Sequence, residues 1–242
     1  MFKHETQVIK FLLQWYSMNA RKLPWRKKNN LNLPHPYFVF VSEYMLQQTT
    51  VNTVKNKFNE FILKWPSLNK LAQTSEPNIL KFWSGLGYYS RARNLLKSAK
   101  IIKNNFKNKI PETYDELIQL PGIGDYTAKA ILGIGYNKSV MPLDANIERI
   151  LVRLHAIDKP INKVKNKLKD LGKKFISDKY SSNLIQSFMD YGSEICLPRN
   201  PKCNICGINK FCQSYKKNLQ QKILEVNFLF LDFYSIRFQI QS

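Results

Sequence analysis

The sequence predicts an all-α fold, and three observations support this prediction. Apolar residues recur at helical spacing near the N-terminus, where Val8, Leu12 and Trp15 share one face of residues 5–18. The helical stretches that follow are separated by short loops carrying proline or glycine. No convincing strand pattern occurs before residue 226. Short helices joined by short loops are typical of an all-helical globule.

The helices can be assigned in order from these patterns and their stop signals. In the first half of the chain we expect helices over residues 5–18, 39–48, 52–65, 67–73, 77–84 and 88–106. In the second half we expect a helix starting at Pro111-Glu112 with Thr113 as its cap, then helices over residues 126–136, 145–157, 163–176 and 181–195. Residues 226–240, rich in Phe, Leu and Ile, are expected to form one or two strands.

Composition points to a polyanionic partner. The chain of 242 residues has 38 Lys and Arg against 17 Asp and Glu, a formal charge of +21 and a pI near 9.8. Nucleic acid is the first candidate and a membrane surface the second, although Lys and Asn are abundant throughout the chain, which weakens charge as a signal. No signal peptide or membrane-spanning run is found, so we expect a cytoplasmic protein.

Residues 117–129 contain a glycine hairpin, Leu120-Pro121-Gly122-Ile123-Gly124. Glycine adopts the positive φ of a tight turn and leaves room for an approaching phosphate. Free amides at the start of the following helix form an anion site. The hairpin therefore indicates a helix-hairpin-helix DNA clamp, with an ordinary helix-helix turn as the alternative.

All four cysteines lie in one loop, Cys196, Cys203, Cys206 and Cys212, separated by six, two and five residues. A cytoplasmic protein rarely uses structural disulfides, so these thiols predict a metal site. Zinc usually takes two well-separated close pairs, and only one close pair is present. A [4Fe–4S] cluster with one Cys per iron is favoured over zinc, and unligated cysteines are the third alternative.

Four further motifs carry a family resemblance. They are Leu23-Pro24-Trp25-Arg26, Ser42-Glu43-Tyr44-Met45-Leu46-Gln47-Gln48-Thr49, Gly85-Leu86-Gly87-Tyr88-Tyr89-Ser90-Arg91-Ala92-Arg93-Asn94 and Leu143-Asp144-Ala145-Asn146. With the hairpin and the cysteine loop, they make residues 5–215 resemble the iron–sulfur helix-hairpin-helix DNA glycosylases, and within them the MutY-type adenine DNA glycosylases. The resemblance implies base excision repair, a monomer with a [4Fe–4S] cluster, and double-stranded DNA with A:G or A:8-oxoguanine mispairs as partner.

The resemblance also implies two helical lobes with a cleft between them. Residues 24–136 would form a six-helix barrel lobe with the hairpin at 113–130. Residues 1–23 and 137–215 would form the iron–sulfur lobe. Residues 216–242 would be a tail, the remnant of the Nudix-like domain with which full-length MutY-type enzymes recognise 8-oxoguanine, so we expect a truncated chain.

Two carboxyl side chains are the expected catalytic pair. Glu43 follows the apolar residues 37–41, which would raise its pKa and keep it protonated, so that it delivers a proton to adenine N7. Asp144, at a helix start near donors, would stay ionised and face the sugar oxocarbenium ion. By resemblance, Tyr126 hydrogen-bonds near Asp144 and Asn146 places water. The alternatives are a solvated Glu43, a purely capping Asp144, a packing Tyr126 and a helix-turn Asn146.

Further roles come from the resemblance alone. Gln186 would read the edge of the extruded adenine, and Trp25, Arg26 and Leu46 would line the pocket, with core packing as the alternative for Trp25 and Leu46. The residues that fill the gap in the duplex would be Gln48 and Tyr88. Gly122 and Gly124 would bind DNA phosphates.

Some positions restrict or complicate this interpretation. Endonuclease III, a relative of the family, has a Schiff-base lysine where this chain has Tyr126, so a monofunctional glycosylase is expected. Ala145, Ile147 and Glu148 depart from the family pattern after Asp144, and Glu148 would weaken a phosphate contact. Two other functions stay open: a thymine or uracil mismatch glycosylase, and a non-catalytic iron–sulfur DNA-binding protein.

Overall fold

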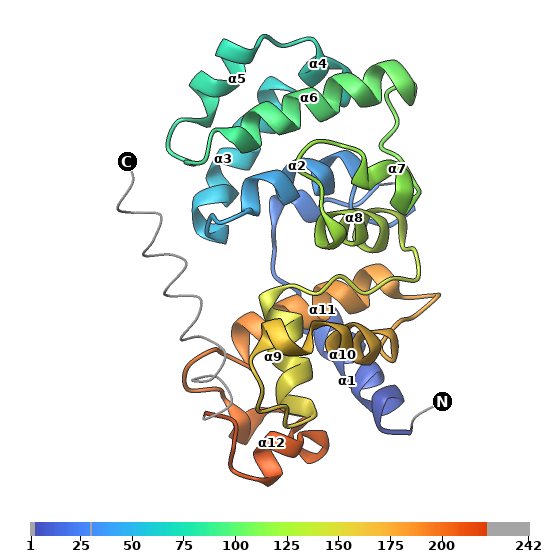
Figure 1. Cartoon of the computed structure of the whole chain (residues 1–242), viewed down its shortest axis with the longest axis vertical. Helices are drawn as coiled ribbons and strands as arrows, with labels where there is room; N and C mark the ends of the chain where they lie inside the picture. The colour runs from blue at the N-terminus through green and yellow to red at the C-terminus, as the bar shows by residue number, and fades with distance from the viewer. Residues whose placement is uncertain (1–2, 30, 222–242) are drawn as a thin grey trace. The chain divides into compact units, whose positions relative to one another are not determined.

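The computed structural model describes residues 3–29 and 31–221, in which the regular structure is helical (Figure 1). An isolated β-bridge joins Lys28 to Pro34 in these residues. The all-α prediction is therefore confirmed for the described part of the chain. The strands predicted at 226–240 lie outside the described residues.

The chain divides into two compact units. The first holds the described residues up to 20 together with 143–177 and 183–221, and the second holds 21–142 and 178–182. The sequence placed its boundaries at 23/24 and 136/137, whereas the structure has them at 20/21 and 142/143. The sequence analysis placed residues 178–182 in the iron–sulfur lobe, whereas in the structure they belong to the second unit.

The second unit is built around α2 (Pro36–Leu46), in which residues 39–45 are all buried. This helix packs against α3, α6, α8 and η2 because its apolar residues surround it on every side. The other elements of the unit are η1 (Pro24–Arg26), α3 (Val51–Lys64), α4 (Leu68–Ala72), α5 (Glu76–Trp83), α6 (Ser90–Asn105), α7 (Tyr114–Ile118), α8 (Asp125–Ala130) and the π-helical turn η2 (Ile131–Gly135).

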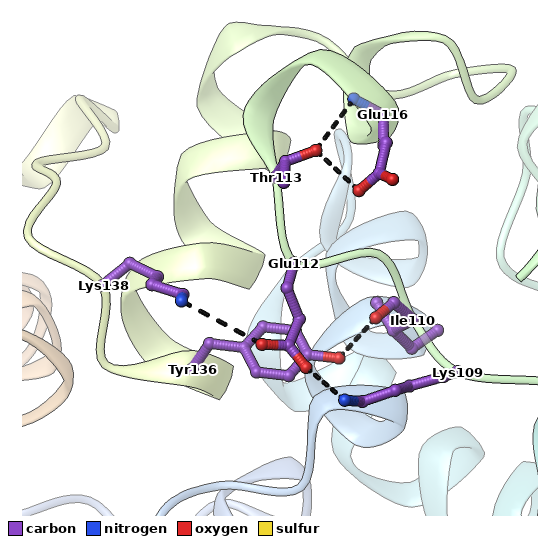
Figure 2. Close-up of polar contacts among 7 residues, drawn as sticks. All are labelled: Lys109, Ile110, Glu112, Thr113, Glu116, Tyr136 and Lys138. Carbon is purple, nitrogen blue, oxygen red and sulfur yellow. Dashed lines mark hydrogen bonds and ion pairs between the residues drawn. The ribbon is translucent and has the colours of Figure 1, made fainter.

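The first hairpin helix, α7, starts at Tyr114 and not at Pro111, because Thr113 caps its first turn. The hydroxyl of Thr113 accepts a hydrogen bond from the Glu116 amide at 3.4 Å and donates one to Glu116 Oε2 at 2.6 Å (Figure 2). Upstream, Glu112 forms ion pairs with Lys109 and Lys138, and the Tyr136 hydroxyl donates to the carbonyl of Ile110. These contacts join the start of the hairpin to the chain after η2.

The helix predicted over residues 126–136 is interrupted. It begins one residue earlier, at Asp125, and changes from α-helical to π-helical geometry after Ala130. All five residues of η2 are buried, and η2 packs on α2. Sequence periodicity does not distinguish the two helical forms over so short a stretch.

The first unit contains α1 (Lys3–Asn19), α9 (Ala145–Leu154), α10 (Ile161–Lys173), α11 (Ser181–Glu194), η3 (Cys203–Ile205), η4 (Asn209–Phe211) and α12 (Gln213–Lys216), with the first two residues of α11 belonging to the second unit. Helix α9 packs against α10 and α12. A Cβ placed at Gly192 of α11 would lie 2.6 Å from the Cβ of Asn146, so α9 and α11 approach closely at this point. Among the helices described, none is both long and apolar enough to cross a membrane.

Candidate active site and cysteine loop

Glu43 lies in the buried stretch of α2, with 6% of its surface exposed. The helix starts sharply because His35 caps it through Nδ1, which accepts a hydrogen bond from the amide of Tyr37, and Pro36 occupies its first turn. Glu43 is therefore buried with the apolar residues that precede it on α2, and its raised pKa and acid role stay predictions. The alternative of a solvated helix residue is wrong.

Asp144 is the N-cap of α9, as predicted. Its Oδ1 accepts a hydrogen bond from the amide of Ile147 at 2.7 Å, and its Oδ2 accepts one from Asn146 Nδ2 at 3.0 Å. Burial raises the pKa of Asp144, while these two donors and the charge of Arg149 act in the opposite direction. The sequence analysis expected the donors but not the burial, and burial has the larger effect.

Arg149 holds this end of α9 in place. It is 3% exposed, and its Nη2 donates to Asn146 Oδ1 at 2.8 Å and to the carbonyl of Gly192 at 2.7 Å. Its Nε donates to the carbonyl of Cys196 at 2.7 Å. A continuous set of hydrogen bonds therefore runs from Asp144 through Asn146 and Arg149 to the first cysteine. The sequence analysis missed Arg149, although an arginine among the apolar residues of α9 was a visible signal.

Gln48 and Tyr88 share an unusual backbone conformation. Their backbone φ angles are 55° and 46°, in the left-handed region that residues other than glycine rarely adopt. Tyr88 is 53% exposed and Gln48 is also exposed. Both are thus held at the surface of the second unit by constrained turns, an arrangement compatible with the predicted wedge role.

Arg91 anchors the turn that carries Tyr88, and the sequence analysis did not single it out. This buried guanidinium donates from Nη1 to the carbonyl of Met45 at 2.7 Å, near the end of α2, and from Nη2 to that of Leu86 at 2.7 Å. It also lies 5.7 Å from the centre of the Tyr88 ring. Arg91 therefore fixes the Gly85–Tyr88 turn against the end of α2.

The two hairpin glycines meet different surroundings. Gly122 has a φ of +80°, and a Cβ there would lie 3.0 Å from the Cβ of Asn94. Gly124 has ordinary backbone angles and no atom within 4 Å of such a Cβ. The turn is anchored by Tyr44, whose hydroxyl donates to the carbonyl of Pro121 at 2.5 Å. Gly122 is therefore required by the fold, whereas the open space at Gly124 is available to a partner.

The remaining predicted site residues lie in both units. Trp25 is buried edge-to-face against Phe58 at 5.6 Å, which fits the packing alternative. In the second unit Arg26, Leu46 and Tyr126 are half-buried, and in the first unit Gln186 of α11 is buried. The predicted site residues are divided between the units: Trp25, Arg26, Glu43, Leu46, Gln48, Tyr88, Gly122, Gly124 and Tyr126 belong to the second, and Asp144, Asn146, Gln186 and the four cysteines to the first.

The cysteine loop is packed onto α9 and α11. Arg153 of α9 donates to Cys196 Sγ at 3.3 Å and to the carbonyl of Leu197 at 2.7 Å. The hydroxyl of Tyr191, on α11, donates to Cys206 Sγ at 3.2 Å. The four thiols are half-buried and form no disulfide. Polar hydrogens therefore point at two of the sulfur atoms, as a thiolate requires.

The thiols also influence one another. Burial raises the pKa of Cys206 to about 11, and burial likewise raises the pKa of Cys203 and Cys212. The charge of Cys196 adds to the rise at all three. In the part of the chain described, no three His, Cys, Asp or Glu side chains converge closely enough to bind a single metal ion.

The helical fold, the glycine hairpin and the capped Asp144 together define a helix-hairpin-helix protein of DNA repair. Comparison with known families supports this class directly. The pattern of the HhH-GPD superfamily of base excision DNA repair proteins matches residues 41–174, more than half of the chain. The chain belongs to this family.

Individual relatives and solved structures agree with the assignment. The chain is 44% identical over 218 residues to the adenine DNA glycosylase of Buchnera aphidicola subsp. Baizongia pistaciae, covering 89% of this chain and 60% of that relative. A thermostable thymine-DNA glycosylase superposes with a TM-score of 0.76 at 26% identity, covering 89% of this chain and 98% of that structure. Endonuclease III in a non-covalent DNA complex superposes with a TM-score of 0.70 at 20% identity. The match covers 91% of this chain and 100% of that structure, so the two share the fold.

Proposed function

We propose that this protein is a monofunctional DNA N-glycosylase of base excision repair that releases adenine mispaired with guanine or 8-oxoguanine. The observation that carries the proposal is the geometry of Asp144, whose two oxygens are fixed by Ile147 and Asn146 at the start of α9. A carboxylate held in this way is suited to stabilising positive charge that develops on a sugar. Similarity to an adenine DNA glycosylase at 44% identity supports adenine as the base.

Release of adenine also needs an acid, because the base departs easily only when it is protonated. Glu43 is the proposed acid, delivering its proton to adenine N7. Its position in the buried stretch of α2 supports this role, since an acid surrounded by apolar groups keeps its proton more readily than one in water. Glu43 and Asp144 then divide the work: one donates a proton, and the other faces the cation.

Water completes the reaction in place of an enzyme nucleophile. Tyr126, in the first turn of α8, offers no amine to attack the sugar, so no imine forms between enzyme and DNA. Asn146 donates to Asp144 and accepts from Arg149, which fixes its amide for positioning the attacking water. The product is an intact strand with an abasic site.

The target adenine must leave the duplex before these groups reach it. Gln48 and Tyr88, held in left-handed turns, are the proposed residues that fill the gap. Gln186 is proposed to hydrogen-bond the adenine edge, with Trp25, Arg26 and Leu46 around the base. The hairpin at Gly122 and Gly124 is proposed to hold the DNA backbone.

A [4Fe–4S] cluster is the proposed cofactor, held by Cys196, Cys203, Cys206 and Cys212. Its fit is supported by the four mutually interacting thiols and by the donors from Tyr191 and Arg153. The cluster would supply structural support for the loop. Purified protein is expected to be brown, with about four irons per chain. Cys203→Ser should lower the iron content and the DNA affinity, and stoichiometric zinc in place of iron would contradict the assignment.

The decisive test is single-turnover excision from duplexes with A:G, A:8-oxoguanine and T:G pairs, each followed by alkali. We expect cleavage at adenine and none at thymine. The T:G duplex is included because a thymine-DNA glycosylase superposes well on this chain. Glu43→Gln and Asp144→Asn should each lower the rate by about 10² to 10⁴ with little loss of duplex binding. Excision of thymine, or unchanged rates in both variants, would refute the assignment.

A further inference from the structure

Glu148 carries a half-buried carboxyl group in the first turn of α9, and the proposed function gives this residue no role. Within the described residues it makes no side-chain hydrogen bond and no ion pair within 4 Å. Its amide donates to the carbonyl of Asp144 at 2.9 Å, so the two residues are one helical turn apart. Glu148 therefore lies in the first turn of the helix that Asp144 caps.

The surroundings of Glu148 favour its neutral form. Burial, and after it the charge of Asp144, raise its pKa to about 7, while Lys165 of α10 acts in the opposite direction. Of the helices that lie against α9, α10 supplies Lys165, and no group of α11 or α12 influences Glu148. On α9 itself, Arg149 is turned toward Asn146, Gly192 and Cys196. Asp144 is thus the negatively charged group that acts on Glu148.

We propose that Glu148 is a positioning residue that acts through Asp144: it stays neutral beside the ionised Asp144, and when it loses its proton the affinity for DNA falls. The first half of this proposal depends only on the geometry of α9. The second half rests on the proposed function, in which Asp144 faces a deoxyribose.

The chemistry of DNA supplies the link between the two halves. A deoxyribose facing Asp144 carries a phosphate on each side, so the start of α9 lies close to two negative charges. A neutral Glu148 leaves Asp144 as the single negative charge in this turn. An ionised Glu148 adds a second, which repels the phosphates but does not weaken stabilisation of a sugar cation. Binding and chemistry should therefore respond differently to pH.

The pairing can be tested without DNA by following the carboxyl carbon of Glu148 by NMR during a pH titration. In the intact protein we expect a midpoint near 7, the value to which burial and the Asp144 charge raise its pKa. In Asp144→Asn the midpoint should move to clearly lower pH because the neighbouring charge is gone. A midpoint in the ordinary range of glutamate, or one that Asp144→Asn leaves unchanged, would overturn the proposal.

The consequence for DNA is tested by the affinity for a duplex with a non-hydrolysable adenosine opposite 8-oxoguanine, on either side of neutral pH. The affinity of the unmodified protein should fall about threefold to tenfold more with rising pH than that of Glu148→Gln. Its single-turnover rate should show the same pH dependence as that of Glu148→Gln.

A matched control is Glu60→Gln, which removes an exposed carboxylate of α3 that pairs with Lys57 at 3.4 Å. This variant should keep the pH dependence of the unmodified protein. Equal pH dependence in Glu148→Gln and the unmodified protein would overturn the second half of the proposal. Absence of adenine excision would overturn the proposed function alone, because the NMR titration involves no DNA.

Discussion

Arg149 donates a hydrogen bond from Nε to the backbone carbonyl of Cys196 at 2.7 Å. The same guanidinium contacts Asn146, which in turn contacts Asp144. A residue that serves neither as metal ligand nor as proposed catalyst therefore joins the cysteine loop to the proposed catalytic carboxylate. Because it is buried, its loss would leave several carbonyl groups without a donor.

We expect Arg149→Ala to lower the free energy of unfolding by about 2–4 kcal/mol and to slow adenine excision, because Asn146 loses its support. Urea denaturation and single-turnover kinetics measure the two effects. The control is Arg93→Ala, which removes an exposed ion pair with Glu76 and should cost less than about 1 kcal/mol. Equal stability of the two variants would show that the Arg149 network contributes little.

Asp144→Asn should make the protein more stable at mildly alkaline pH. Burial raises the pKa of Asp144 above its unfolded value, so the stability this group contributes is present at low pH and lost as pH rises through the raised pKa. Asparagine still caps α9 without a charge to bury. The Tm of the variant should exceed that of the unmodified protein at alkaline pH, with a smaller difference at acidic pH. A lower Tm at every pH would be incompatible with this reasoning.

The two hairpin glycines should separate stability from DNA binding. Gly122→Ala places a Cβ at positive φ, 3.0 Å from Asn94, and should cost about 1–3 kcal/mol of stability. Gly124→Ala meets open space and ordinary backbone angles, so its stability should change by less than about 0.5 kcal/mol. Its affinity for duplex DNA should nevertheless fall, measured by fluorescence anisotropy, because the added methyl occupies the approach to the backbone amides. Unchanged DNA affinity in Gly124→Ala would place the DNA backbone elsewhere.

Borohydride should trap no covalent complex between the protein and its DNA, because Tyr126 lacks an amine. Product strands should remain intact until alkali is added. Tyr126→Lys restores an amine at this position and should introduce weak strand cleavage, detectable on a denaturing gel. Strand nicking by the unmodified protein, with contaminating nucleases excluded, would show that another amine reaches the sugar.

Features that depend on neighbouring residues in the sequence were predicted well. The caps at Thr113 and Asp144 were identified correctly because a cap is formed by a residue and the amides two or three positions later. The start of α7 was placed at Pro111, three residues too early, because proline in a first turn and a capping threonine compete as start signals. Local signals thus located the helices but not every boundary.

The sequence by itself determined the helical class of this protein, the hairpin, the capping Asp144 and the four-cysteine loop, because each follows from residue type and spacing along one short segment. Only the tertiary structure decided the burial that raises the pKa of Asp144 and the roles of Arg149 and Arg91. An arginine in a helix usually points to solvent, and its identity does not tell which distant carbonyls it meets. Desolvation and long-range hydrogen bonds depend on which segments pack together, and that is settled only when the whole chain has folded.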